Sequence, residues 1–201
     1  LSNQQLTLSL PDRRRYEATQ INVPQGNRAA VMINASRQGF GGAIDLEAFN
    51  LPDGVTVTPI QMPANRTTVP LLLTAADDAA LDGRLVDFVG KVADNPNVAS
   101  QFTQRHQLLI GRNKSVVYDY NANRSAVSVT KKLPCTLEVV QPQVPIVRNG
   151  SSNLVVKVNR QDFDSEISVR MLYNPPGIGS SGSIKIPKGA NEVSIPITAN
   201  G

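Results

Sequence analysis

The feature that most constrains this fold is a regular succession of short β-type runs separated by turn residues. Runs such as LTLSL (6–10), AAVMINA (29–35) and TTVPLLLTA (67–75) are rich in apolar residues, and several alternate apolar with polar. Turn-forming clusters such as NLPDG, MPANR and DNPN separate them. Short strands with turns at this spacing are typical of β-sandwiches and barrels.

An internal repeat divides the chain. Residues 21–57 align with residues 144–180 at a constant offset of 123 without a gap. The six identities in these 37 positions are Arg37/Arg160, Gln38/Gln161, Phe40/Phe163, Ile44/Ile167, Pro52/Pro175 and Gly54/Gly177. After a further shift of one to three residues, MPANRTTVPL parallels IPKGANEVSIPI. A repeat of ~120 residues is too long for a solenoid unit and indicates two copies of one domain.

The repeated segments resemble a known kind of module. LPDGVTVTPIQMPANRTTVPLLLTAADDA resembles the repeated Ig-like modules of large secreted bacterial proteins that also carry pre-peptidase C-terminal domains. VPIVRNGSSNLVVKVNRQDF and the residues after it are similar to the next module in such proteins. The resemblance covers roughly residues 20–112 and 135–201. It implies an Ig-like fold, an extracytoplasmic location (periplasmic, cell-surface or secreted) and modules without catalytic residues.

We therefore expect an all-β chain of two tandem immunoglobulin-like antiparallel β-sandwiches. The expected parts are a first sandwich at 1–112, a linker or hairpin at 113–134 and a second sandwich at 135–201. The hairpin would turn at Asn121 to Arg124. Strand alternation places one set of side chains inside the first sandwich: Val31, Ile33, Ile44, Leu46, Val69, Leu71, Leu73, Val86 and Phe88.

The second sandwich is expected to be truncated. In the first copy, TTVPLLLTA is followed by two more strand-like runs, RLVDFVGKV and QRHQLLIG, and the second copy has none after EVSIPITA. The missing strands would leave an apolar face and strand edges open. Three outcomes are open: the 115–130 hairpin fills the gap, a second molecule supplies a strand, or a weakly folded half-domain persists.

Composition restricts the partners. The net charge is +4, but the basic residues are scattered and no aromatic residues accompany the single run Arg13 to Arg15, so we expect no nucleic acid partner. No apolar run is long enough to span a membrane. The expected partners are other domains of the same polypeptide, together with a protein or glycan ligand in the adhesion alternative below.

The sequence offers little catalytic chemistry, and we expect neither an enzyme nor a cofactor. One histidine, His106, and one cysteine, Cys135, exclude an intramolecular disulfide and a Cys-rich zinc site. No G-x-S-x-G elbow surrounds a serine. The glycine-rich NPPGIGSSG (174–182) is not followed by a helix signal, so it predicts a turn rather than a phosphate-binding loop.

Two residue sets remain as candidate sites. The acidic residues Asp162, Asp164 and Glu166 alternate in DFDSE, which suits a loop calcium site or simply solvated carboxylates. A second acidic set stands in ADDAALDG. For a ligand, the aromatic candidates are Tyr118, Tyr120 and Tyr173. We expect a non-catalytic structural or interaction module that spaces or presents other domains; the alternative is a carbohydrate- or protein-adhesion module.

Overall fold

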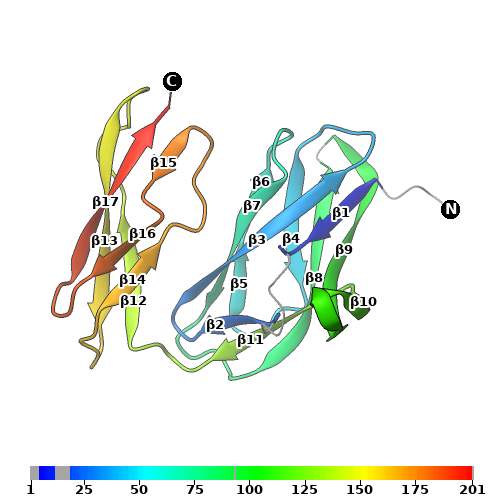
Figure 1. Ribbon diagram of the computed structural model, residues 1–201, viewed down its shortest axis with the longest axis horizontal. Coiled ribbons are helices and arrows are strands. Elements are labelled where there is room, and N and C mark those ends of the chain that lie inside the picture. Colours follow the sequence, from blue (N-terminus) through cyan, green and yellow to red (C-terminus); the bar gives the residue numbers. More distant parts are fainter. Residues whose placement is uncertain (1–4, 12–18, 93, 201) are drawn as a thin grey trace. The chain divides into compact units, whose positions relative to one another are not determined.

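The computed structural model describes residues 5–11, 19–92 and 94–200 and divides the chain into two compact units, Leu1–Lys132 and Leu133–Gly201 (Figure 1). Both units are built from β-strands. Within the described residues, the only helical element is a short 3-10 turn at Arg112–Lys114, and no helix is long and apolar enough to cross a membrane.

The first unit is an Ig-like sandwich. One layer has the strand order β1-β3-β7-β5 and the other has the order β6-β4-β8-β9, which are the ABED and C′CFG sheets of the immunoglobulin fold. The strands of this unit are β1 (Leu6–Ser9), β2 (Ile21–Pro24), β3 (Arg28–Arg37), β4 (Ile44–Phe49), β5 (Val55–Thr58), β6 (Ile60–Met62), β7 (Thr68–Ala75), β8 (Gly83–Val92), β9 (Asn95–Ile110), β10 (Val116–Ala122) and β11 (Ser125–Thr130).

Alternating residues of these strands form the first core. In β7, for example, every second residue is buried, because successive side chains of a strand point to opposite faces. All nine side chains that the sequence placed inside are buried in this core, so that prediction is confirmed. Figure 1 shows the two layers between which this core lies.

Two strand pairs in the first unit are parallel, whereas the sequence predicted only antiparallel pairing. β1 runs parallel to β9, with Leu8 opposite Phe102, and β2 runs parallel to β11, with Val127 opposite Ile21. β9 pairs with the end of β8 and β11 with its beginning. The first part of β9 and β11 thus pair with the same strand, β8, one after the other along its length. The residues between Thr103 and Ser125 form an insertion between these two segments.

The predicted linker and hairpin need correction. The sequence assigned 113–134 to a linker or to a hairpin turning at Asn121 to Arg124, but β10 pairs with β9 and β11 pairs with β8 and β2. Val127 and Val129 of β11 are buried in the first core, which ties this polar-looking segment to the first unit. These strands are used there and do not complete the second unit.

The second unit repeats most of the first. Its strands form the sheets β12-β13-β17-β15 and β14-β16. Ile44 pairs with Met62, and Ile167 pairs with Ile186 in the same way at offsets of 123 and 124. The strands are β12 (Cys135–Val140), β13 (Ser151–Arg160), β14 (Ile167–Arg170), β15 (Ile178–Ser180), β16 (Ser183–Ile186) and β17 (Glu192–Ala199).

The second sandwich is incomplete in the part of the chain that the structure describes. β12, β13, β14, β15, β16 and β17 correspond to β1, β3, β4, β5, β6 and β7, and β8 and β9 have no counterpart. Its buried core is accordingly small and consists of Val156, Val158, Val169, Ile186 and Ile195. Within the described residues, the second unit therefore holds no counterparts of β8 and β9.

Candidate interaction site

The arginine that the two copies share serves the scaffold. The Arg37 guanidinium donates hydrogen bonds to the carbonyl oxygens of Arg66 and Pro63, and burial lowers the pKa of Arg37. Arg160 donates in the same way to the carbonyls of Ala190 (3.0 Å) and Pro187 (3.1 Å), which are the equivalent loop residues. The shared arginine therefore fixes the loop before β7 in the first unit and before β17 in the second.

The glycine-rich stretch is a turn, as predicted. Gly54 and Gly177 have φ angles of +78° and +79°, a conformation that favours glycine. In each copy the next residue donates its backbone N–H to the carbonyl of the shared proline, Val55 to Pro52 and Ile178 to Pro175, both at 3.0 Å. The same hydrogen bond in both copies shows that these residues shape the backbone.

The calcium candidates are engaged separately. Asp162 has a φ of +51° at the position where the first copy has Gly39, also at positive φ. Asp164 accepts a hydrogen bond from the Gly189 N–H at 2.9 Å, and Glu166 forms an ion pair with Lys185 at 2.7 Å. Within the described ranges no three His, Cys, Asp or Glu side chains gather as a metal site. The structure gives calcium binding no further support.

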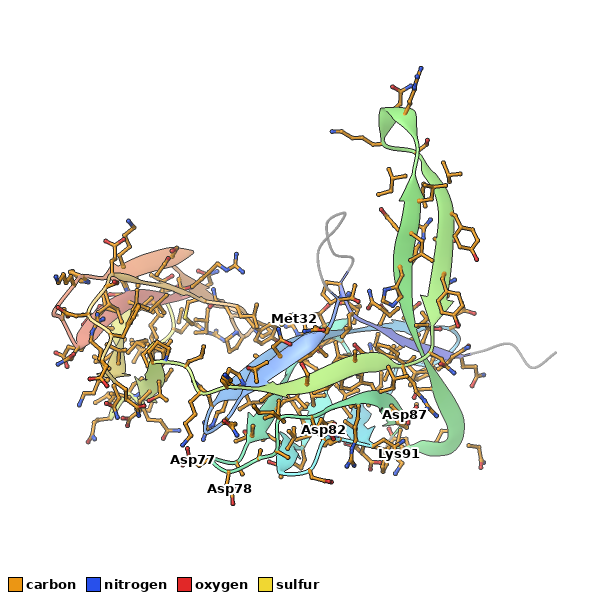
Figure 2. All side chains as sticks on the ribbon, turned by 90° about the horizontal axis from the view of Figure 1, so that it is seen from below. Met32, Asp77, Asp78, Asp82, Asp87 and Lys91 are labelled. Carbon is orange, nitrogen blue, oxygen red and sulfur yellow. The ribbon has the colours of Figure 1, made fainter. Side chains whose placement is uncertain are left out.

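The remaining reactive side chains are also dispersed. Asp77 pairs with Lys132 at 2.8 Å, and Figure 2 shows Asp77 and Asp78 on the same loop. His106 lies in β9 with Nδ1 3.4 Å from Thr19 Oγ1. Cys135 begins β12 and packs partly buried against the second core. These positions do not assemble a nucleophile with a base.

The most prominent surface feature is the β9–β10 hairpin, defined as residues 104–122. Figure 2 shows it, drawn in green, projecting away from the body of the first unit. Gln104 at its base is buried, and β10 pairs with no strand other than β9 among the described strands. Five large apolar or aromatic side chains on it are between 56% and 61% exposed: Leu108, Leu109, Val117, Tyr118 and Tyr120.

The two faces of this hairpin differ. Tyr118 and Tyr120 alternate along β10 and so project on one side. Opposite residues of antiparallel strands share a face, so His106, opposite Tyr120, lies on this side. Two register shifts interrupt the ladder, one between Val116 and Tyr118 and one between Tyr118 and Asp119.

The other face of the hairpin is mainly polar. Its Arg105 Nε donates to Asp119 Oδ2 at 2.6 Å, and Asn121 lies opposite Arg105. The hairpin is therefore amphipathic, with its two tyrosines on the less polar side.

The three tyrosine candidates fall in different places. Tyr118 and Tyr120 lie together on the hairpin of the first unit, whereas Tyr173 is half-buried in the second unit after β14. Two of the three tyrosines named from the sequence are thus exposed on the hairpin, and their binding of a ligand stays a prediction. Sequence reasoning missed Leu108 and Leu109, because QRHQLLIG resembles an ordinary sandwich strand.

A second open surface lies on the second unit. Leu8 of β1 and Leu137 of β12 occupy equivalent positions, opposite Ala35 and Val158 respectively. Leu8 is 0% exposed, but Leu137 is 51% exposed. Val139, opposite the buried Val156, is 57% exposed. Leu137 and Val139 share the inner face of the sheet, and no described strand of the second unit takes the places of β8 and β9.

The comparisons with known proteins give a likeness of fold only. No protein-family model and no curated protein matches this sequence. Among solved structures, titin domains Z1Z2 in complex with telethonin match at 10% identity over 99% of this chain and 80% of that chain, with a TM-score of 0.27. Fibronectin(III)-like modules of Clostridium thermocellum CbhA match at 11% identity, 94% and 77% coverage and a TM-score of 0.28. Titin Ig tandem domains A164–A165 match at 7% identity, 99% and 80% coverage and a TM-score of 0.25. TM-scores this low say nothing about what this chain binds or does.

Proposed function

We propose that this chain is a non-catalytic structural or interaction module that spaces or presents other domains. It would be a tandem Ig-like part of a larger secreted or surface bacterial protein. One observation carries the proposal: the arginine and the Pro-x-Gly turn that the copies share act on the backbone in both units. A duplicated scaffold whose common residues hold loops and turns suits a spacing role.

The alternative is an adhesion module with a ligand site on the hairpin. Tyr118 and Tyr120 favour it, because they are exposed on a projecting element and aromatic faces can stack on sugar rings or pack against a protein. Location outside the cytoplasm and kinship with modules that accompany pre-peptidase C-terminal domains belong to the same proposal, supported by the resemblance of the repeated segments.

A paired screen tests both versions. The purified chain is applied to a glycan array and to a panel of esterase, glycosidase and peptidase substrates. No turnover and no glycan binding support the structural module. Binding that is lost in a Tyr118→Ser/Tyr120→Ser variant but kept in Asn121→Ser, on the opposite face, supports the adhesion module. Turnover above the buffer rate would contradict both. Protease accessibility of the parent protein on intact cells tests the proposed location.

A further inference from the structure

The tip of the β9–β10 hairpin carries charge of one sign. Residues 95–118 contain no Asp or Glu, although the chain has 16 such residues. Arg112 and Lys114 belong to the 3-10 turn at the tip, and both are exposed; together they are called the basic tip. The charge of Arg105, nearer the base, is balanced by its ion pair with Asp119. The basic tip is therefore a place of local positive potential.

The turn that carries the basic tip has a defined conformation. The Gly111 N–H donates to the Ser115 carbonyl at 2.8 Å, and the Ser115 hydroxyl donates to the Arg112 carbonyl at 2.9 Å. Asn113 and Lys114 have φ angles of +57° and +63°, and such left-handed values are uncommon in residues other than glycine and asparagine. The hairpin thus presents its two cations from a closed turn.

An apolar face lies beside this turn. Leu109 lies opposite Tyr118, so the two side chains share a face, and Tyr120 follows on it by alternation. These three residues, called the apolar face, are each more than half exposed. The opposite face carries the Arg105–Asp119 ion pair. Basic residues next to an exposed apolar and aromatic face are the combination by which amphipathic elements bind the interface of an anionic membrane.

We propose that the β9–β10 hairpin binds an anionic lipid surface. The apolar face lies at the level of the headgroups and upper acyl chains, and the basic tip contacts lipid phosphates. The inference names the surface on which the interaction role would act, and it so rests on the proposed function.

The hairpin suits the interface rather than the hydrocarbon core of a membrane. Among the described strands, β10 pairs only with β9, and beyond Thr103 β9 pairs only with β10. Backbone N–H and C=O groups on the two outer edges therefore need water or phosphate as partners, and hydrocarbon offers neither. Tyrosine also favours the headgroup level, where its ring is in apolar surroundings and its hydroxyl in water.

A lipid surface matches the hairpin better than a soluble acidic partner. An acidic polymer would pair with the basic tip but would leave the apolar face in water, whereas a lipid surface contacts both. Figure 2 shows the hairpin projecting from the first unit on the side opposite the loop of Asp77, Asp78 and Asp82. An extended anionic surface can therefore reach the hairpin without approaching these carboxylates.

Vesicle sedimentation tests the inference on the full chain. The unaltered chain should bind vesicles of equal parts phosphatidylcholine and phosphatidylglycerol, bind pure phosphatidylcholine weakly and dissociate as salt is raised. Arg112→Gln/Lys114→Gln should weaken binding roughly tenfold or more, and Leu109→Ser/Tyr118→Ser by a similar factor. All four side chains are exposed, so the fold should persist.

Matched controls separate local from general effects. Arg28→Gln/Lys131→Gln removes the same charge from exposed positions elsewhere in the first unit and should bind like the unaltered chain. Because the chain contains no Trp, a single introduced Trp reports its own surroundings. With anionic vesicles, the emission of Tyr118→Trp on the apolar face should shift to shorter wavelength, and that of Asn121→Trp on the opposite face should not.

Four results would overturn the inference. They are no binding to anionic vesicles, an equal loss in the Arg28→Gln/Lys131→Gln control, equal emission shifts at positions 118 and 121, and binding to soluble polyglutamate as strong as to the vesicles. The last result would assign the basic tip to an acidic polymer. The vesicle assay and the array and substrate screen are separate measurements, so failure here would leave the proposed function to be decided by the screen.

Discussion

Replacing an equivalent leucine by alanine in each unit, Leu8 in the first and Leu137 in the second, compares a closed sandwich with an open one. Leu8 is fully buried, and Leu→Ala at such sites costs ~2–5 kcal/mol, because a cavity adds to the lost transfer energy. Leu137 is 51% exposed. Fully burying a leucine contributes ~1.5–3 kcal/mol, and Leu137 gains only about half of that. Because its removal also leaves no closed cavity, Leu137→Ala should lower the free energy of unfolding by about 1 kcal/mol or less.

Amide hydrogen exchange measures the opening free energy of each unit separately within the same chain. Peptides from β3 report the opening free energy of the first unit, and peptides from β13 report that of the second. Equal losses for Leu8→Ala and Leu137→Ala would refute the account of an open second sandwich, because equal losses require equal burial.

Two further predictions concern a turn and a titration. Gly177→Ala should lower the free energy of unfolding by ~1 kcal/mol because of its positive φ. Gly54→Ala should cost ~1–3 kcal/mol more, because a Cβ at Gly54 would lie 2.9 Å from the Ala79 Cβ whereas Gly177 has open space. The same hydrogen-exchange assay compares the two variants, and equal costs would contradict the packing at Ala79. A hydrogen bond to Glu166 raises the pKa of Lys185 above its ordinary value of 10.5. The stabilisation from this ion pair is therefore complete below pH 10.5 and is lost as the pH rises through the folded-state pKa. Glu166→Gln should lower the pKa of Lys185 in an NMR titration, and an unchanged pKa would count against the ion pair.

Much of the fold follows from local sequence pattern. Alternation identified the first core, because in a sandwich each strand buries one face. The repeat also matches β12 to β17 with strands of the first unit, and the described residues hold no counterparts of β8 and β9 after β17. The segment around β11 was misassigned because its polar residues suggested a linker. Yet Val127 and Val129 alternate as core residues do, and that signal could have placed it in the first unit.

The candidate interaction surfaces could be predicted only in part. Tyr118 and Tyr120 stood out as aromatics, but the projection of their hairpin depends on β9 leaving the sheet after Thr103. Nothing in a local apolar run reveals such a departure, because pairing with distant strands decides it. Leu137 is likewise an ordinary inward residue in sequence, and its exposure depends on which distant strands pack over it, not on its local pattern.

The most direct test of the open second sandwich is residue-resolved hydrogen exchange at its two free edges. In the first unit β4 and β1 each have two neighbours, whereas β14 and β12 have one each among the described strands. By NMR, the amides of β1 and of residues 44–46 of β4, which have partner strands on both sides, should be protected throughout. Those of β14 and β12 should alternate between protected and fast-exchanging residues, since one side of each strand lacks a partner. Uniform protection along β14 and β12, comparable with β4 and β1, would contradict the account.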